Sequence, residues 1–215
     1  MKTSVALKTL LGAASLALPL TTFAESNFQT GNGTLTATAH VNFSVVIPRM
    51  LYLRVGTGST YNTGAYTSVA TADTLLFTLT GAQVGSGAPI AATGGDVTGN
   101  ASAETAALIG NGGSITLTAT NGGALGDGAG DSIPYTQIQT LAAANTFGAT
   151  AILTPPTLAN GASNTVTVTP PAGTKVVQQD AKWTYSYLNT VTPSAGTYGT
   201  TAANNGVVTY TAVML

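Results

Sequence analysis

Few residues of this chain have side chains that could carry out acid–base, nucleophilic or metal chemistry. Its 215 residues include six Lys or Arg, seven Asp or Glu, one His and no Cys. Charged residues make up 6% of the chain, against roughly a quarter in an ordinary globular domain. A nucleic-acid-binding protein needs a basic surface, whereas thiol enzymes, zinc ribbons and disulfide scaffolds need cysteine. The composition therefore excludes all of these classes.

The single histidine has no partners in the sequence that would make it a catalytic base. Hydrolysis of the Ser-His-Asp type needs a serine beside the histidine and an acid that orients it. His40 lies among the polar positions of an alternating segment, and the chain contains no Gly-x-Ser-x-Gly motif. One His and no Cys are also a poor set of ligands for a transition metal. We expect a protein that is not an enzyme, with no catalytic residues, no cofactor and no bound metal.

Two acidic, glycine-rich loops are the remaining candidates for an ion site. The first places Asp127 and Asp131 four residues apart in Gly126–Ser132, and residues 95–100 repeat the composition more loosely. Calcium prefers several oxygen ligands, but this spacing differs from that of an EF-hand, and Gly-Asp is common in turns. We interpret both loops as turns, with calcium at Asp127 and Asp131 as the alternative. The other acids are scattered and do not nominate the carboxylate pair that a glycosidase needs.

An aromatic stripe near the C-terminus could either bind a sugar or fill the core. Trp183, Tyr185 and Tyr187 alternate along residues 182–188, so in a strand they share one face. Because Trp183 is the only tryptophan, and large aromatics at this spacing usually anchor an interior, we predict that the stripe is part of the core. A platform for a glycan ligand is the alternative.

The first 24 residues have the features of a secretory signal peptide. Lys2 and Lys8 precede an apolar stretch over residues 10–20, and Thr22 and Ala24 put small residues where a signal peptidase cuts. The apolar run of about 11 residues is short of the ~20 that span a bilayer, which argues against an uncleaved anchor. We predict cleavage before Glu25 and export to the periplasm, the cell surface or the medium.

The predicted mature chain, residues 25–215, has a small negative charge. It keeps four basic and seven acidic residues, which gives a formal charge of −3. Arg54 falls on a polar face between Leu53 and Val55, so we expect it to serve solubility. The basic residues are Arg49, Arg54, Lys175 and Lys182.

Alternation of apolar and polar residues is the clearest structural signal. From Thr34 to Ile47 the odd positions are apolar and the even positions polar up to Val46, which predicts a strand with one buried face. Pro48 ends this strand, and the alternation resumes over residues 51–55. Residues 101–109 and 141–144 contain helix formers and are the only candidates for short helices. Further strands are predicted over residues 75–80, 115–120, 133–141, 165–169, 182–188 and 208–214.

About eight strands separated by Gly- and Pro-rich segments predict an all-β fold. Asn205-Gly206, just before the last strand, is typical of a hairpin turn. The pattern favours an antiparallel two-sheet immunoglobulin-like sandwich with long Gly-rich loops. We therefore expect a signal peptide over residues 1–24 and a single β-sandwich domain over residues 25–215.

The mature chain resembles exported bacterial β-sandwich surface proteins, above all pilin and spore-coat-U-like subunits and more loosely WxL-type wall-binding domains. The likeness rests on the leader, the Thr-rich strands, the Asn-Gly turn and the closing segment of residues 207–212. It departs from them in having no cysteine pair, and Trp183-Thr184-Tyr185 is not a Trp-x-Leu motif. The resemblance implies a non-enzymatic structural or adhesive subunit of a bacterial surface or fimbrial appendage.

Such a subunit would assemble with itself or with other surface proteins, with the help of a periplasmic chaperone, without nucleic acid and without a membrane span in the mature chain. A monomeric module that binds a glycan or cell-wall material is the alternative, and a hydrolase with a carboxylate pair is a third hypothesis.

The segment Thr34–Ile47 is the candidate for assembly. At ~3.3 Å per residue, its about 14 residues would extend about 46 Å, well beyond a typical strand. It follows Gly31-Asn32-Gly33, a potential hinge, and its seven apolar side chains could complete the sandwich of a neighbour by strand addition. Pairing of the segment within its own domain is the alternative.

Overall fold

The computed structural model describes residues 26–58, 66–145 and 151–215. The chain divides into two units, Met1–Ile47 and Pro48–Leu215. All strands of the described residues lie in the second unit, which we call the β unit. The predicted leader over residues 1–24 and the cleavage site before Glu25 lie outside the described residues. The part of the chain that the structure describes contains no helix long and apolar enough to cross a bilayer.

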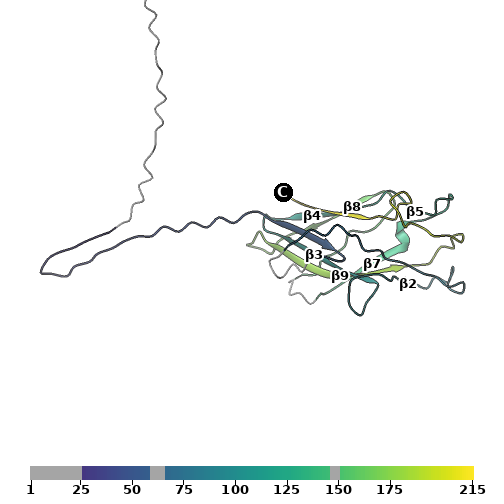
Figure 1. The fold of residues 1–215 in the computed structure, drawn as a ribbon, viewed down its shortest axis with the longest axis horizontal. Coiled ribbons are helices and arrows are strands. Elements are labelled where there is room, and N and C mark those ends of the chain that lie inside the picture. Colours follow the sequence, from purple (N-terminus) through teal and green to yellow (C-terminus); the bar gives the residue numbers. More distant parts are fainter. Residues whose placement is uncertain (1–25, 59–65, 146–150) are drawn as a thin grey trace, which may run out of the picture. The chain divides into compact units, whose positions relative to one another are not determined.

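The second unit is built from antiparallel sheets, which confirms the predicted all-β class. A five-stranded sheet has the order β1-β3-β9-β2, with β7 on the other side of β9, and a three-stranded sheet has the order β10-β4-β8. Figure 1 shows β4 and β8 in one layer and β3, β9 and β7 in the other. A short 3-10 helix, η2 (Tyr135–Gln137), precedes β7, and β5 pairs with β6. The strands are β1 (Leu51–Val55), β2 (Ile90–Ala91), β3 (Ala103–Gly110), β4 (Ile115–Thr120), β5 (Leu125–Gly126), β6 (Ser132–Ile133), β7 (Ile138–Ala143), β8 (Ser163–Val168), β9 (Val177–Tyr187) and β10 (Thr209–Met214).

The main hydrophobic core takes side chains from both large sheets. In β4 the alternation of Ile, Leu and Ala with Thr buries every second residue and leaves the threonines toward solvent. Burial of these apolar side chains is the main favourable term in folding a chain that has no disulfide. The buried members of the core include Ala106, Leu108, Trp183 and Tyr185 from the five-stranded sheet, and Ile115, Leu117, Ala119 and Val168 from the three-stranded sheet.

The short helix considered for residues 101–109 is wrong, because this segment forms β3. Every residue of β3 is buried, since the strand lies between β1 and β9 and is paired along both edges. Ala, Glu and Leu favour a helix by local propensity, but that preference is well under 1 kcal/mol per residue. Pairing on both edges and burial on both faces outweigh it. Residues 141–143 of the other helix candidate lie in β7, which pairs with β9 along one edge.

Two predicted strands are only partly correct. Residues 75–80 contribute an isolated bridge between Leu76 and Thr93, although Leu75, Phe77 and Leu79 are half-buried as the alternation requires. Residues 133–141 are divided among β6, η2 and β7. The turn predicted at Asn205 is present, with Asn205 at a φ of 57° and its N–H bonded to Ala202 O, but it does not join two paired strands.

The segment Thr34–Ile47, predicted to be a strand with one buried face, is not among the strands of the described residues. No pairing between described residues includes this segment, and all of its residues are exposed. Phe43 is 90% exposed and Val45 is 83% exposed. The alternation specifies which side chains share a face, but it does not specify what covers that face.

Candidate functional site

Three acids from different parts of the β unit meet where β1 ends. Glu104 lies on β3, Asp96 lies in the turn before β3, and Asp73 lies in the segment that leads to residues 75–80. The chain leaves β1 at Gly56, whose N–H donates to Thr105 O, and the N–H of Thr57 donates to the Asp73 carboxylate. Gly56 has a φ of 83°, and a Cβ there would collide with Asp73 Oδ2 and stand 2.9 Å from Glu104 Oε2. Both carboxylates therefore crowd the space over this glycine.

Arg54 neutralises one member of the acid cluster. Its Nη2 lies 2.7 Å from Asp96 Oδ2, and its Nε donates to Gly56 O at 2.7 Å. Asp96 Oδ1 in turn accepts the N–H of Thr105 at 2.6 Å. The expectation that Arg54 serves solubility is wrong, because its side chain is largely buried and forms an ion pair across β1 and the turn.

Glu104 is the chemically unusual member of the cluster. Its residue is 3% exposed, and neither carboxylate oxygen has a hydrogen-bond partner of normal geometry among the described residues. Burial first, and then the charges of Asp73 and Asp96, raise the pKa of Glu104 from its usual 4.5 to about 8, while the backbone N–H of Asp96 opposes the shift. This carboxyl group is therefore protonated at neutral pH.

The acid cluster lacks the geometry of a hydrolase site. Glycosidases place two carboxyl groups on opposite sides of a cleft with the sugar between them. Here Asp73 and Glu104 are near neighbours, and Glu104 is covered by the surrounding chain. Within residues 26–58, 66–145 and 151–215, no group of three His, Cys, Asp or Glu side chains is arranged to hold a metal ion.

The aromatic stripe of β9 belongs to the core, as predicted. Trp183 is fully buried, and Tyr185 and Tyr187 are almost fully buried. The Trp183 indole Nε1–H donates to Leu153 O at 2.7 Å, and its ring lies 5.3 Å from that of Tyr210. These rings are therefore unavailable as the glycan platform that was the alternative.

The loop with Asp127 and Asp131 is a turn, as its sequence predicts. Asp127 Oδ1 accepts the backbone N–H groups of Ala129, Gly130 and Asp131 at 2.7–3.0 Å. These donors, with that of Ala129 first, hold the pKa of the Asp127 carboxyl below its usual value. Asp131 accepts a hydrogen bond from the hydroxyl of Ser194. Asp127 therefore stabilises the turn through its backbone, and Asp131 links the turn to the segment at Ser194.

The remaining candidate residues do not come together. His40 is exposed in the segment before the β unit, Lys182 is half-buried on β9, and Lys175 is exposed just before β9. Arg49 lies at the start of the β unit, where its Nη2 donates to the carbonyl of Leu215 at 2.8 Å.

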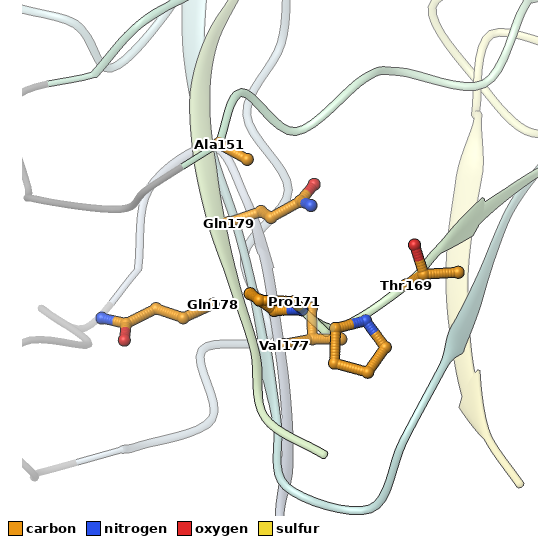
Figure 2. A pocket seen from close by; sticks show the side chains of 7 residues that line it. Ala151, Thr169, Pro171, Val177, Gln178 and Gln179 are labelled. Carbon is orange, nitrogen blue, oxygen red and sulfur yellow. The ribbon is translucent and has the colours of Figure 1, made fainter. Parts of the chain in front are cut away.

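The surface of the β unit has more than one hollow, the larger of about 460 Å³ beside β1. One of about 270 Å³ lies where β8 gives way to β9, and Figure 2 shows Thr169, Pro171 and Gln179 on one side of β9, with the side chain of Gln178 on the other. It contains no aromatic or charged side chain that would select a ligand. A hollow of this kind carries no function by itself.

One edge of the three-stranded sheet has no strand partner among the described residues. β10 pairs with β4 along six residues, and no other described strand pairs with it. Its inward side chains Tyr210, Ala212 and Met214 are only half-buried, although they pack on the main core. An edge of this kind presents unpaired backbone N–H and C=O groups beside incompletely covered apolar side chains.

The buried acid cluster is not evident from the sequence. Asp73, Asp96 and Glu104 belong to three different segments, so the acids look scattered along the chain. The available signal is Glu104 itself, an acid within the otherwise apolar stretch of residues 103–110. Comparisons with protein-family models, with curated proteins and with solved structures find no match to this chain.

Proposed function

We propose that this protein is an exported structural subunit of a bacterial surface assembly, in which the segment Thr34–Ile47 of one copy adds a strand to the β10 edge of the next. The β unit would then be an immunoglobulin-like two-sheet sandwich that is completed only in the assembly. The observation that carries the proposal is the exposure of the apolar face of this segment.

The segment has the properties of an added strand. Its alternation provides one apolar face over about 14 residues, whereas β10 needs a partner of six. Large apolar side chains on that face, such as Val41, Phe43 and Val45, are 75–90% exposed. Burial of one such side chain contributes roughly 1.5–3 kcal/mol, so several together offset much of the cost of association.

The β10 edge has the properties of an acceptor. Its free side is open to main-chain hydrogen bonds, and β1 contacts β10 from the other large sheet. Leu53 and Val55 of β1 are half-buried against the same core as the inward side chains of β10. A strand added beside β10 would cover these half-buried residues with the apolar face of the segment.

If Thr34–Ile47 is an added strand, assembly needs its apolar face and folding of the β unit does not. Matched aspartate variants test this. Phe43→Asp and Ala39→Asp place a charge on the apolar face, and Asn42→Asp places the same charge on the polar face. We expect the first two to melt at the temperature of the parent and to remain monomeric in gel filtration and electron microscopy. Asn42→Asp should assemble like the parent.

Two results would contradict this function. If Phe43→Asp and Ala39→Asp unfold the protein, the segment is an internal strand. If the parent chain itself stays monomeric at high concentration in the mature form, the segment does not drive assembly. Because the chain has no native cysteine, Ser44→Cys in one copy and Val213→Cys in another should form a disulfide only where segment and β10 are paired.

A further inference from the structure

We propose that Glu104 and Asp73 share one proton in the folded protein, and that the resulting hydrogen bond fastens the chain at Asp73 onto the ends of β1 and β3. The two carboxyl groups thereby join the segment at Asp73 to the point at Gly56 where the chain leaves β1. This device belongs to the folded β unit and is independent of the proposed assembly.

Geometry requires a proton between these groups. Glu104 is buried and has no donor of normal geometry for either oxygen among the described residues. Its Oε2 and Asp73 Oδ2 crowd the same point over Gly56, where an added Cβ would meet both. Two ionised carboxylates have no hydrogen to share between them and repel each other. If Glu104 keeps its proton, its O–H donates to Asp73, and one bond replaces the repulsion.

The other groups that face Glu104 leave this arrangement intact. From β1, Arg54 forms an ion pair with Asp96. From β9 and β10, the hydroxyls of Tyr185 and Tyr210 lie 3.2 Å from each other, and the charge of Glu104 would raise the pKa of both. No cation is therefore directed at Glu104 by the described elements packed against it.

Asp73 is hydrogen-bonded to two parts of the chain, so its bond to Glu104 holds the segment at Asp73 on the sheet. It accepts the N–H of Thr57, which follows β1, and the proton of Glu104, which lies on β3. The next residues, Leu75 and Phe77, are half-buried against the main core. Loss of the proton would put two negative charges at the point where this segment joins the sheet.

The sign of the pH dependence follows from the retained proton. Between pH 4.5 and about 8, Glu104 is protonated in the folded protein and ionised in the unfolded chain. Its contribution to stability is therefore greatest below pH 4.5. Between pH 4.5 and about 8 the unfolding equilibrium constant rises about tenfold per pH unit. Above about pH 8 both states are ionised, and the contribution is constant.

The experiment is equilibrium unfolding of the full chain from pH 5 to 9, compared among the parent, Glu104→Gln and Asp127→Asn. The amide introduced by Glu104→Gln donates to Asp73 and does not titrate. The unfolding equilibrium constant of this variant should therefore lack the tenfold rise per pH unit that Glu104 contributes in the parent. Asp127→Asn changes an exposed acid that is already ionised in this range, so it should behave as the parent. Equal pH dependence in the parent and in Glu104→Gln would overturn the proposal.

A second measurement keeps the test decisive if Glu104→Gln does not fold. The side-chain carboxyl carbon of Glu104 can be followed by NMR in the folded parent, where we expect a midpoint near 8 and a midpoint near 4.5 would overturn the proposal. Calcium chloride serves as the probe for a bridging cation. A rise in the melting temperature with calcium that Glu104→Gln abolishes would show a metal ion in place of the proton, and would also overturn it.

Discussion

Removal of the Trp183 ring should destabilise the β unit more than any comparable change at its surface. The side chain is fully buried between β9 and the segment at Leu153, and it contacts the ring of Tyr210. Truncation of a buried tryptophan to alanine costs about 3–5 kcal/mol through lost burial and the cavity that remains. Trp183→Ala should therefore lower the free energy of unfolding by that amount.

A second variant isolates the hydrogen bond from the packing. Trp183→Phe keeps an aromatic ring but leaves the carbonyl of Leu153, a fully buried residue, without the indole N–H. An unsatisfied buried acceptor costs about 1–3 kcal/mol. We therefore expect Trp183→Phe to lie between the parent and Trp183→Ala.

Thermal unfolding followed by circular dichroism measures both effects. For a chain of this size a change of 1 kcal/mol shifts the melting temperature by about 2–4 °C, so Trp183→Ala should melt roughly 6–20 °C below the parent. Val176→Ala, at an apolar residue that is 48% exposed, is the control, and should stay within about 0.5 kcal/mol of the parent. A Trp183→Ala protein that melts like the parent, and instead loses binding to a polysaccharide, would refute the core assignment.

Three further predictions concern the leader, calcium and a buried amide. The exported protein should begin at Glu25, which intact mass measures, and a membrane-bound chain that retains residues 1–24 would contradict this. Calcium or a chelator should leave the melting temperature unchanged, because the carboxylate of Asp127 is occupied by backbone N–H groups; a rise of several degrees that Asp131→Ala removes would revive the calcium site. Asn189→Ala should lower the free energy of unfolding, measured with denaturant, by about 3 kcal/mol. The Asn189 amide is fully buried, accepts the N–H of Gly85 and donates to the carbonyl of Gln83. The backbone φ of 57° at this position also disfavours alanine. Asn189→Gly, which tolerates that φ, should lose less, and equal losses would place the whole cost in the hydrogen bonds.

Much of the β unit follows from the alternation of side chains alone. In β4, β8 and β10 the apolar residues and threonines occupy opposite faces, so the sequence predicts both the strands and the side that each one buries. The same reasoning correctly places Trp183 and its neighbours on β9 in the core. These features are local, because a strand exposes its two faces whatever its partners are.

Contacts between distant segments decided the rest. Residues 103–110 became a strand because β1 and β9 pair with both of its edges, which outweighs a weak helical preference. Glu104 is a buried acid because β3 lies between β1 and β9, and Asp73 and Asp96 from neighbouring segments further raise its pKa. Thr34–Ile47 has the clearest strand pattern in the sequence but no strand partner among the described residues. Alternation along one segment specifies its faces, whereas pairing and burial depend on which other segments the folded chain brings beside it.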